Sequence, residues 1–163
     1  MTSELSIRRA VAGDEDLIMA LLVELAEYER LTHLFALTKE VVARDFVGSG
    51  KAVHCELAYA DGVPVGIAVW YWTYTTFAAG RGLYLEDLYV RERVRGRGYG
   101  KALLTHLARE AATHGAIRVE WSVLNWNKPS IAFYESIGAQ PVDEWTIYRL
   151  TGAALRELAG VRA

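Results

Sequence analysis

The feature that most constrains the fold is a strand-like run that leads through a basic, glycine-rich turn into an amphipathic helix. The run spans residues 83–90, the turn is Arg95-Gly96-Arg97-Gly98-Tyr99-Gly100, and the helix is expected from about residue 98 to 114. The first turn of such a helix offers unpaired N–H groups that can bind an anion. Gly98 and Gly100 have no Cβ, so the backbone can approach a diphosphate closely. The segment predicts a phosphate cradle, with a solvated basic turn as the alternative.

Two common phosphate-binding loops do not fit this turn. A Walker A loop needs glycine five positions before its Gly-Lys pair and Ser or Thr after it, and the chain has Arg95 and Ala102 there. The dinucleotide fingerprint G-x-G-x-x-G needs a third glycine where Lys101 stands. Neither a kinase or ATPase nor a dinucleotide-binding protein is expected.

Length and charge narrow the class of protein. A chain of 163 residues with 52% hydrophobic content predicts a single domain over residues 1–163 with a substantial core. A net charge of −2, without an extended stripe of Lys and Arg, argues against a nucleic-acid partner. The first residues lack the basic and apolar regions of a signal peptide, and no segment offers about twenty apolar residues for a membrane span. A cytoplasmic protein is expected, with no membrane partner.

The sequence gives little support for a catalytic cysteine, a disulfide or a histidine metal site. Cys55 is the single cysteine, so an intramolecular disulfide is impossible, and its apolar strand-like surroundings favour a core residue over a nucleophile. The histidines at 33, 54, 106 and 114 show no metal-ligand spacing. No metal site is predicted.

The hydrophobic periodicity alternates between strand and helix and predicts an α/β fold with a mixed central sheet. Asp61-Gly62 is the strongest hairpin signal, Thr38 is a plausible N-cap, and Gly115 is a plausible helix-ending glycine. Strands are expected at residues 5–8, 54–60, 63–73, 83–90, 117–124 and 145–150. Helices are expected at residues 14–30, 39–47, 98–114 and 129–137, with a last one at 153–158.

The motif Arg95-x-x-Gly98-x-Gly100-Lys101-Ala102 resembles the acyl-CoA loop of the GNAT N-acetyltransferases. Further segments, in the right order over almost the whole chain, are similar to those of the diamine N-acetyltransferases, the spermidine/spermine and thialysine enzymes. These segments are residues 25–31, 84–90, 126–130 with Phe133-Tyr134, and Gly138-Ala139. The resemblance implies a single GNAT-like domain with a mostly antiparallel sheet flanked by helices. It also implies a homodimer, with the C-terminal strand and helix as candidate interface elements.

The same resemblance implies acetyl-CoA as cosubstrate. It predicts that the strand carrying Leu88 and Val90 splays away from the strand ending near Asn125, so that backbone groups of Leu88 and Val90 bind the pantetheine between them. Residues 96–101 would hold the pyrophosphate, and residues 127–130 would line the far side. The predicted cofactor-binding residues are Leu88, Tyr89, Val90, Arg95, Gly96, Arg97, Gly98, Tyr99, Gly100, Lys101, Asn127, Lys128, Pro129 and Ser130.

Acetylation of an amine calls for a proton acceptor. An alkylamine has a pKa near 10.4, so deprotonating it at pH 7 costs about 4 to 5 kcal/mol. Glu86 is the candidate base, directly or through a water, and its charge also attracts a cation. Because strand side chains alternate, Asp87 is expected on the opposite face of the sheet. A solvated carboxylate at a strand end is the alternative for Glu86.

The departing thiolate calls for a proton donor. Tyr134 corresponds to the acid of the family's Phe-Tyr pair, and a phenol near the sulfur can protonate it. Taken alone, a tyrosine on an amphipathic helix favours core packing. The resemblance favours catalysis by direct transfer within a ternary complex.

The acceptor is predicted to be a small cationic amine. Tyr28 and Glu29 correspond to a family position that contacts the amine, although Glu29 could also be a surface glutamate. The long-polyamine enzymes carry an acidic residue and a tryptophan where this chain has Thr75 and Phe77, which favours a diamine or a lysine-like amino acid. Residues 70–72 could wall the pocket or lie in the core. A peptide-lysine acetyltransferase, a hydroxyl or aminoglycoside acceptor, and a non-catalytic acyl-CoA sensor stay open.

Overall fold

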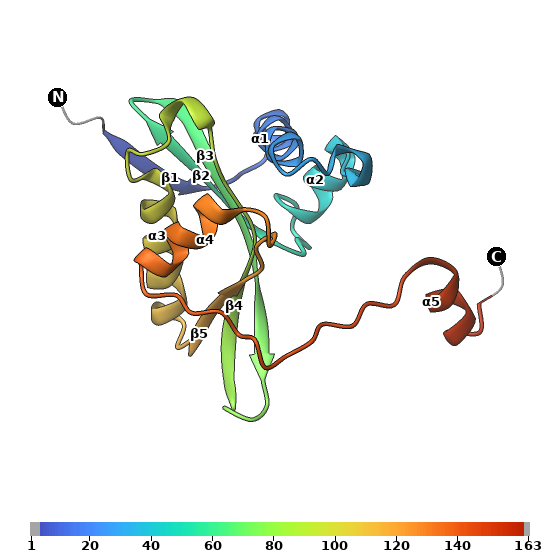
Figure 1. Ribbon diagram of the computed structural model, residues 1–163. Coiled ribbons are helices and arrows are strands. Elements are labelled where there is room, and N and C mark those ends of the chain that lie inside the picture. The colour runs from blue at the N-terminus through green and yellow to red at the C-terminus, as the bar shows by residue number, and fades with distance from the viewer. Residues whose placement is uncertain (1–3, 162–163) are drawn as a thin grey trace. The chain divides into compact units, whose positions relative to one another are not determined.

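A five-stranded sheet organises the first of two compact units in the chain, one ending at Ser122 and the other beginning at Val123. The computed structural model describes residues 4–161 (Figure 1). Strands lie in sequence order across the sheet, and each neighbouring pair is antiparallel except the last, which is parallel. They are β1 (Leu5–Arg9), β2 (His54–Ala60), β3 (Val63–Thr75), β4 (Gly80–Val90) and β5 (Arg118–Trp121). The predicted α/β fold with a mixed, mostly antiparallel sheet is confirmed.

The β2–β3 hairpin turns at the predicted dipeptide. Asp61 and Gly62 have φ angles of 49° and 75°, the left-handed backbone that two-residue hairpin turns require. Asp61 also accepts a hydrogen bond from the Glu4 N–H on Oδ1 at 2.9 Å, which fixes the turn against the chain just before β1.

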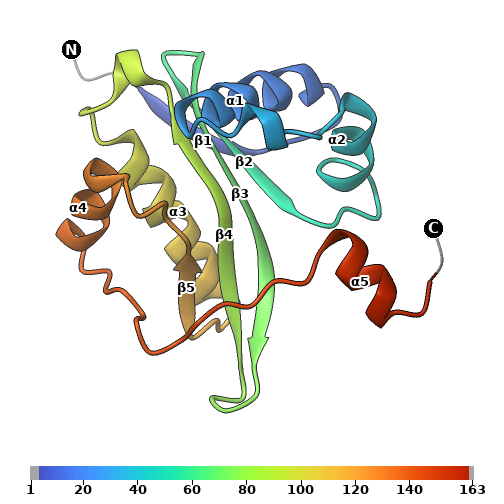
Figure 2. The same ribbon diagram turned by 45° about the vertical axis from the view of Figure 1, so that its right-hand side comes forward.

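Helices cover both faces of the sheet (Figure 2). On one face lie α1 (Glu15–Tyr28) and α2 (Lys39–Asp45), and on the other lies α3 (Tyr99–Thr113). Thr38 is the predicted N-cap of α2, since its hydroxyl accepts a hydrogen bond from the Val41 N–H at 3.4 Å. Short 3₁₀ turns follow α1 at η1 (Thr32–Leu34) and β4 at η2 (Glu92–Val94). None of the helices within residues 4–161 has the length and apolar character needed to cross a membrane.

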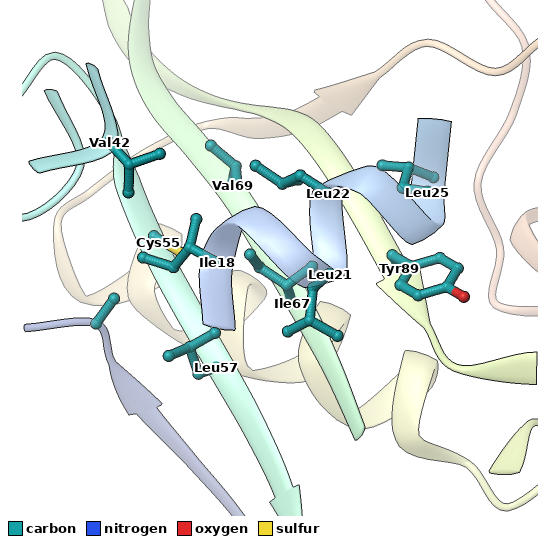
Figure 3. Close-up of a cluster of buried hydrophobic side chains, with 11 residues drawn as sticks. Ile18, Leu21, Leu22, Leu25, Val42, Cys55, Leu57, Ile67, Val69 and Tyr89 are labelled. Atoms are coloured by element: carbon teal, nitrogen blue, oxygen red, sulfur yellow. The ribbon is translucent and has the colours of Figure 1, made fainter. Parts of the chain in front are cut away.

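The apolar stripe of α1 packs on the sheet in a buried core (Figure 3). Its side chains recur at the predicted helical spacing and contact those strand residues that face α1. Cys55 is buried among them, and burial raises the pKa of its thiol, which disfavours a nucleophilic thiolate. The labelled side chains are Ile18, Leu21, Leu22, Leu25, Val42, Cys55, Leu57, Ile67, Val69 and Tyr89.

The opposite face of the sheet has a second core beneath α3. Trp70 is fully buried there and donates its indole N–H to Glu56 Oε1 at 3.2 Å. Glu56, itself buried, pairs with Arg9 at 2.8 Å, so its charge is compensated. Trp72 meets Trp70 edge to face, with ring centroids 4.9 Å apart. Trp70 is therefore a core residue of the α3 face, and the partly buried Trp72 packs against it.

The second compact unit contains α4 (Lys128–Ser136) and α5 (Gly152–Leu158). The predicted strand at residues 145–150 is wrong, because these residues are exposed and belong to no strand in the described part of the chain. Their alternating side chains are typical of a strand, but a strand also needs a neighbour to pair with its backbone groups. A single domain over residues 1–163 stays a prediction.

Candidate active site

The parallel pair β4–β5 comes apart at one end. Its register runs from Gly82 opposite Arg118 to Leu85 opposite Trp121. Beyond that point β4 continues to Val90, whereas β5 ends at Trp121, three residues short of the predicted 117–124 boundary. Residues 87–90 therefore keep their antiparallel partner β3 but have no partner in β5. The pairing of the two strands thus ends before Leu88 and Val90, and their divergence stays a prediction.

The backbone of this open edge has a defined direction. The Arg91 N–H donates to the Val65 carbonyl at 2.9 Å, and a Cβ on Gly66 would lie 2.7 Å from the Tyr89 carbonyl oxygen. Both observations show that the backbone groups of the odd-numbered residues at this end of β4 point toward β3. Because alternate residues point their backbone groups to opposite edges, those of Leu88 and Val90 point away from β3. These are the two residues predicted to bind a pantetheine chain.

The glycine-rich turn presents a helix N-terminus beside this edge. Gly96 and Gly98 have φ angles of 77° and 84°, which favour glycine, and Gly98 is the N-cap of α3 without a side-chain cap. The N–H groups of Tyr99, Gly100 and Lys101 precede the first helical bond, which joins the Ala102 N–H to the Gly98 carbonyl. The first turn holds no acidic residue, so its dipole and Lys101 together favour an anion.

A β-bulge at Glu86 determines which side chains share a face. Val69 lies opposite Asp87, but the next residue, Trp70, lies opposite Leu85, so Glu86 is the extra residue in β4. Asp87 shares the face of Val69, and Tyr71, two residues from Val69, shares it as well. The Tyr71 hydroxyl donates to Glu86 Oε2 at 3.4 Å. Glu86 and Asp87 therefore lie on one face, and the expectation that Asp87 faces away is wrong.

An acidic cluster, defined as Glu29, Glu86 and Asp87, forms where α1 ends over β4. Burial raises the pKa of Glu29, the residue that follows α1. Burial, and then the charges of Glu86 and Glu29, raise the pKa of Asp87 to about 7. The charges of Glu86 and Glu29 therefore oppose ionisation of Asp87, and a bound ammonium group would relieve that repulsion. The cluster is chemically suited to a cation.

Sequence reasoning missed Asp87 as a functional candidate. Strict alternation assigned it to the other face, and a bulge leaves no mark in the hydrophobic pattern. Two adjacent acids in an otherwise apolar strand are the one signal that the sequence offers. Of the aromatic residues 70–72, which could wall the pocket or lie in the core, only Tyr71 lies on the face of the acidic cluster.

Tyr28 and Arg95, predicted on the amine and cofactor sides, contact each other. The Arg95 guanidinium carbon lies 4.3 Å from the centre of the Tyr28 ring. The same guanidinium donates from Nε to the Val90 carbonyl at 2.9 Å. Arg97 and Lys101 are exposed at the turn itself.

The remaining predicted site residues lie in the second unit. Asn127 is buried and is the N-cap of α4, since its Oδ1 accepts a hydrogen bond from the Ser130 N–H at 3.3 Å. Pro129 occupies the first turn, where its missing N–H costs nothing. Tyr134 is partly buried on α4, and its ring lies 5.4 Å from that of Phe133.

The comparisons with known proteins decide the family. The model of the acetyltransferase (GNAT) family matches residues 18–139. The chain belongs to the GNAT acetyltransferase family. This GNAT match includes most of α1, the β4 bulge, the glycine-rich turn and α4.

Several curated proteins resemble this GNAT acetyltransferase over most of its length. A thialysine N-epsilon-acetyltransferase from Bos taurus is 38% identical, and the match covers 94% of this chain and 96% of that protein. An L-ornithine N5-acetyltransferase from Arabidopsis thaliana is 32% identical, with 93% and 86% covered. Among solved structures, an integron cassette protein from the mobile metagenome of V. cholerae has a TM-score of 0.81 at 27% identity, with 98% of both chains covered.

Proposed function

We propose that this acetyltransferase transfers the acetyl group of acetyl-CoA to a primary amine of a small cationic acceptor, a diamine, a polyamine or a lysine-like amino acid. The acidic cluster at the β4 bulge carries the proposal, because three carboxylates on one face favour an acceptor with more than one positive charge. The relatives named for thialysine and ornithine support an acceptor of this size and charge.

The residues beside the cluster fit acetyl-CoA. Backbone groups of Leu88 and Val90 on the open edge of β4 suit the amides of a pantetheine chain. The uncapped N-terminus of α3, with Arg97 and Lys101, suits a diphosphate. By resemblance, residues 127–130 are also proposed to bind the cofactor. Acetyl-CoA supplies the acetyl group as an activated thioester, and the protein orients it.

Glu86 is the proposed general base. It is exposed on the cluster face and can take the proton of the acceptor's ammonium group, directly or through a water. Tyr71 donates a hydrogen bond to its carboxylate and restrains it. Asp87 and Glu29 attract the cation and hold it at Glu86. The neutral amine then attacks the acetyl carbon in a ternary complex, without an acetylated enzyme. The tetrahedral intermediate loses its extra N–H proton to water and breaks its C–S bond, which leaves the amide.

Tyr134 is the proposed general acid. Its phenol gives a proton to the sulfur as the thiolate departs, so that the leaving group is the neutral thiol. This assignment rests on the match of Phe133-Tyr134 to the family's Phe-Tyr pair. A cytoplasmic location likewise stays a prediction from the sequence.

A homodimer is the proposed assembly. The exposed apolar side chains of Trp145, Ile147 and Leu158 support it, because monomers seldom leave so many large apolar groups in water along one short segment. A monomeric mass by light scattering would contradict it.

The test of this function is acetyl-CoA-dependent thiol release with a panel of acceptors: putrescine, spermidine, spermine, thialysine, lysine and a lysine-containing peptide. Preference for a free diamine or lysine analogue is the expected result. Transfer to the peptide alone would indicate a peptide-lysine acetyltransferase. Binding of acetyl-CoA without transfer to any acceptor would indicate a sensor and overturn the proposal.

A further inference from the structure

Arg95 opens the glycine-rich turn, yet its side chain is directed away from that turn. Its Nε donates to the Val90 carbonyl at 2.9 Å, and an Nη atom lies 3.5 Å from Glu92. The guanidinium lies between two aromatic rings, 4.3 Å from the centre of Tyr28 and 5.6 Å from that of Tyr89. The side chain is only 35% exposed. Four contacts therefore hold Arg95 against the end of α1.

A second arginine makes a parallel contact one turn earlier on α1. Arg91 donates to both carboxylate oxygens of Glu24, with the shortest distance 2.8 Å, and also to the Pro64 carbonyl. Glu24 and Tyr28 are four residues apart and so lie on one side of α1. Arg91 and Arg95 thus connect the end of β4 to two successive turns of the helix.

The contact with Tyr28 also restrains the stretch of chain that carries Glu29 of the acidic cluster. Tyr28 is the last residue of α1, and Glu29 comes directly after it in the chain. The backbone then reverses at Arg30, whose φ of 60° is left-handed. A restraint on the Tyr28 ring therefore restrains the backbone at the end of α1, from which the Glu29 side chain projects.

We propose that Arg95 is a positioning residue for the amine acceptor, which holds Tyr28 and through it Glu29, and that it is not a ligand of the diphosphate. Arg97 and Lys101 are then the side chains that supply positive charge to the phosphates. The proposal rests on the proposed function, because it assigns the end of α1 to the acceptor.

The test compares Arg95→Gln with Arg97→Gln, two neutral variants of the same turn. Arg95→Gln should raise the KM for the amine by about fivefold or more, since it removes the cation from the ring. It should change the Kd for CoA, measured by calorimetry, less than twofold. Arg97→Gln should raise the Kd for CoA and leave the KM for the amine nearly unchanged. Its CoA affinity should also depend less on salt concentration than that of the unsubstituted protein. A loss of CoA affinity in Arg95→Gln that matches Arg97→Gln would overturn the proposal.

Variants of the partner ring separate positioning from a general loss of structure. Tyr28→Leu removes the ring and should raise the KM for the amine as Arg95→Gln does, whereas Tyr28→Phe keeps the ring and should raise it less. The double variant of Tyr28→Leu and Arg95→Gln should be no worse than either single one. Fully additive effects would contradict the proposal. If Arg95→Gln also lowers stability, Arg95→Lys serves as a second variant. It keeps a cation at the ring, so its KM for the amine should lie closer to that of the unsubstituted protein than the KM of Arg95→Gln does.

The calorimetric result is independent of turnover. If no acceptor is acetylated, the proposed function fails, while the CoA affinities of Arg95→Gln and Arg97→Gln still decide whether Arg95 is a phosphate ligand.

Discussion

At the scale of single residues, the acidic cluster shows how backbone geometry changes the chemistry that side chains can perform. Glu86 and Asp87 are neighbours in a strand, and regular alternation would separate them onto two faces. The extra residue in β4 brings both to the face that Glu29 approaches from α1. The sequence predicted Glu86 and Glu29 as candidates but not Asp87, because a bulge depends on pairing with β3.

The raised pKa of Asp87 predicts a stability change with pH. Its pKa of about 7 lies above the ordinary value of 3.8, so the folded protein binds a proton between these values that the unfolded chain releases. Stability from this group is therefore present at low pH and is lost as pH rises through 7, by up to about 4 kcal/mol. Asp87→Asn removes this ionisable group. Its free energy of unfolding should therefore exceed that of the unsubstituted protein by more at pH 8 than at pH 5.

Urea unfolding at the two pH values measures this difference. Asp143→Asn, at an exposed position, is the control and should give the same difference at both pH values. An equal response of Asp87→Asn at pH 5 and pH 8 would show that Asp87 ionises as it does in the unfolded chain.

Tyr134→Phe should lower kcat at least tenfold, because the ring remains and only the proton donor is lost. The Kd for acetyl-CoA should change little. Tyr148→Phe, which removes an exposed phenol in the same unit, is the matched control and should keep full activity. A steady-state kcat for Tyr134→Phe equal to that of the control would remove Tyr134 from the mechanism.

At the scale of elements, the sequence predicted features that depend on adjacent residues well and features that depend on strand pairing poorly. The N-cap Thr38, the Asp61-Gly62 turn and the passage from β4 into α3 each depend on a few adjacent residues, and all are present. Residues 145–150 have the side-chain pattern of a strand, but pairing needs a distant partner that the pattern does not name. The predicted end of β5 at residue 124 is wrong for the same reason, because β5 ends at Trp121, where its pairing with β4 stops.

Gly98→Ala tests the turn as an element. The left-handed backbone at φ 84° should cost an alanine about 1 kcal/mol of stability, and since no atom lies within 4 Å of the added Cβ, strain is the whole cost. CoA affinity should fall severalfold, because relief of the strain moves the N–H groups of α3. Gly13→Ala, with φ 103° and equally open space, should lose similar stability and keep CoA affinity. Equal CoA affinities in the two variants would contradict the assignment of the turn.

At the scale of the whole molecule, the first unit carries the acidic cluster and the proposed pantetheine and diphosphate sites, whereas Tyr134 and residues 127–130 belong to the second unit. The sheet brings the open edge of β4, the N-terminus of α3 and the end of α1 together within residues 4–122, although they come from separate stretches of sequence. The family resemblance predicted this arrangement from four motifs, whereas composition and periodicity alone reached only an α/β protein with a phosphate-binding turn.

Selection of a cationic acceptor by the acidic cluster is measured most directly by the ratio of kcat/KM for cadaverine to that for pentylamine. The two amines share a five-carbon chain, and only cadaverine has a second positive charge for the acidic cluster. We predict a ratio of about ten or more, which should fall toward one in Glu29→Gln and Asp87→Asn. A ratio near one in the unsubstituted protein would contradict selection of a cationic acceptor by these carboxylates.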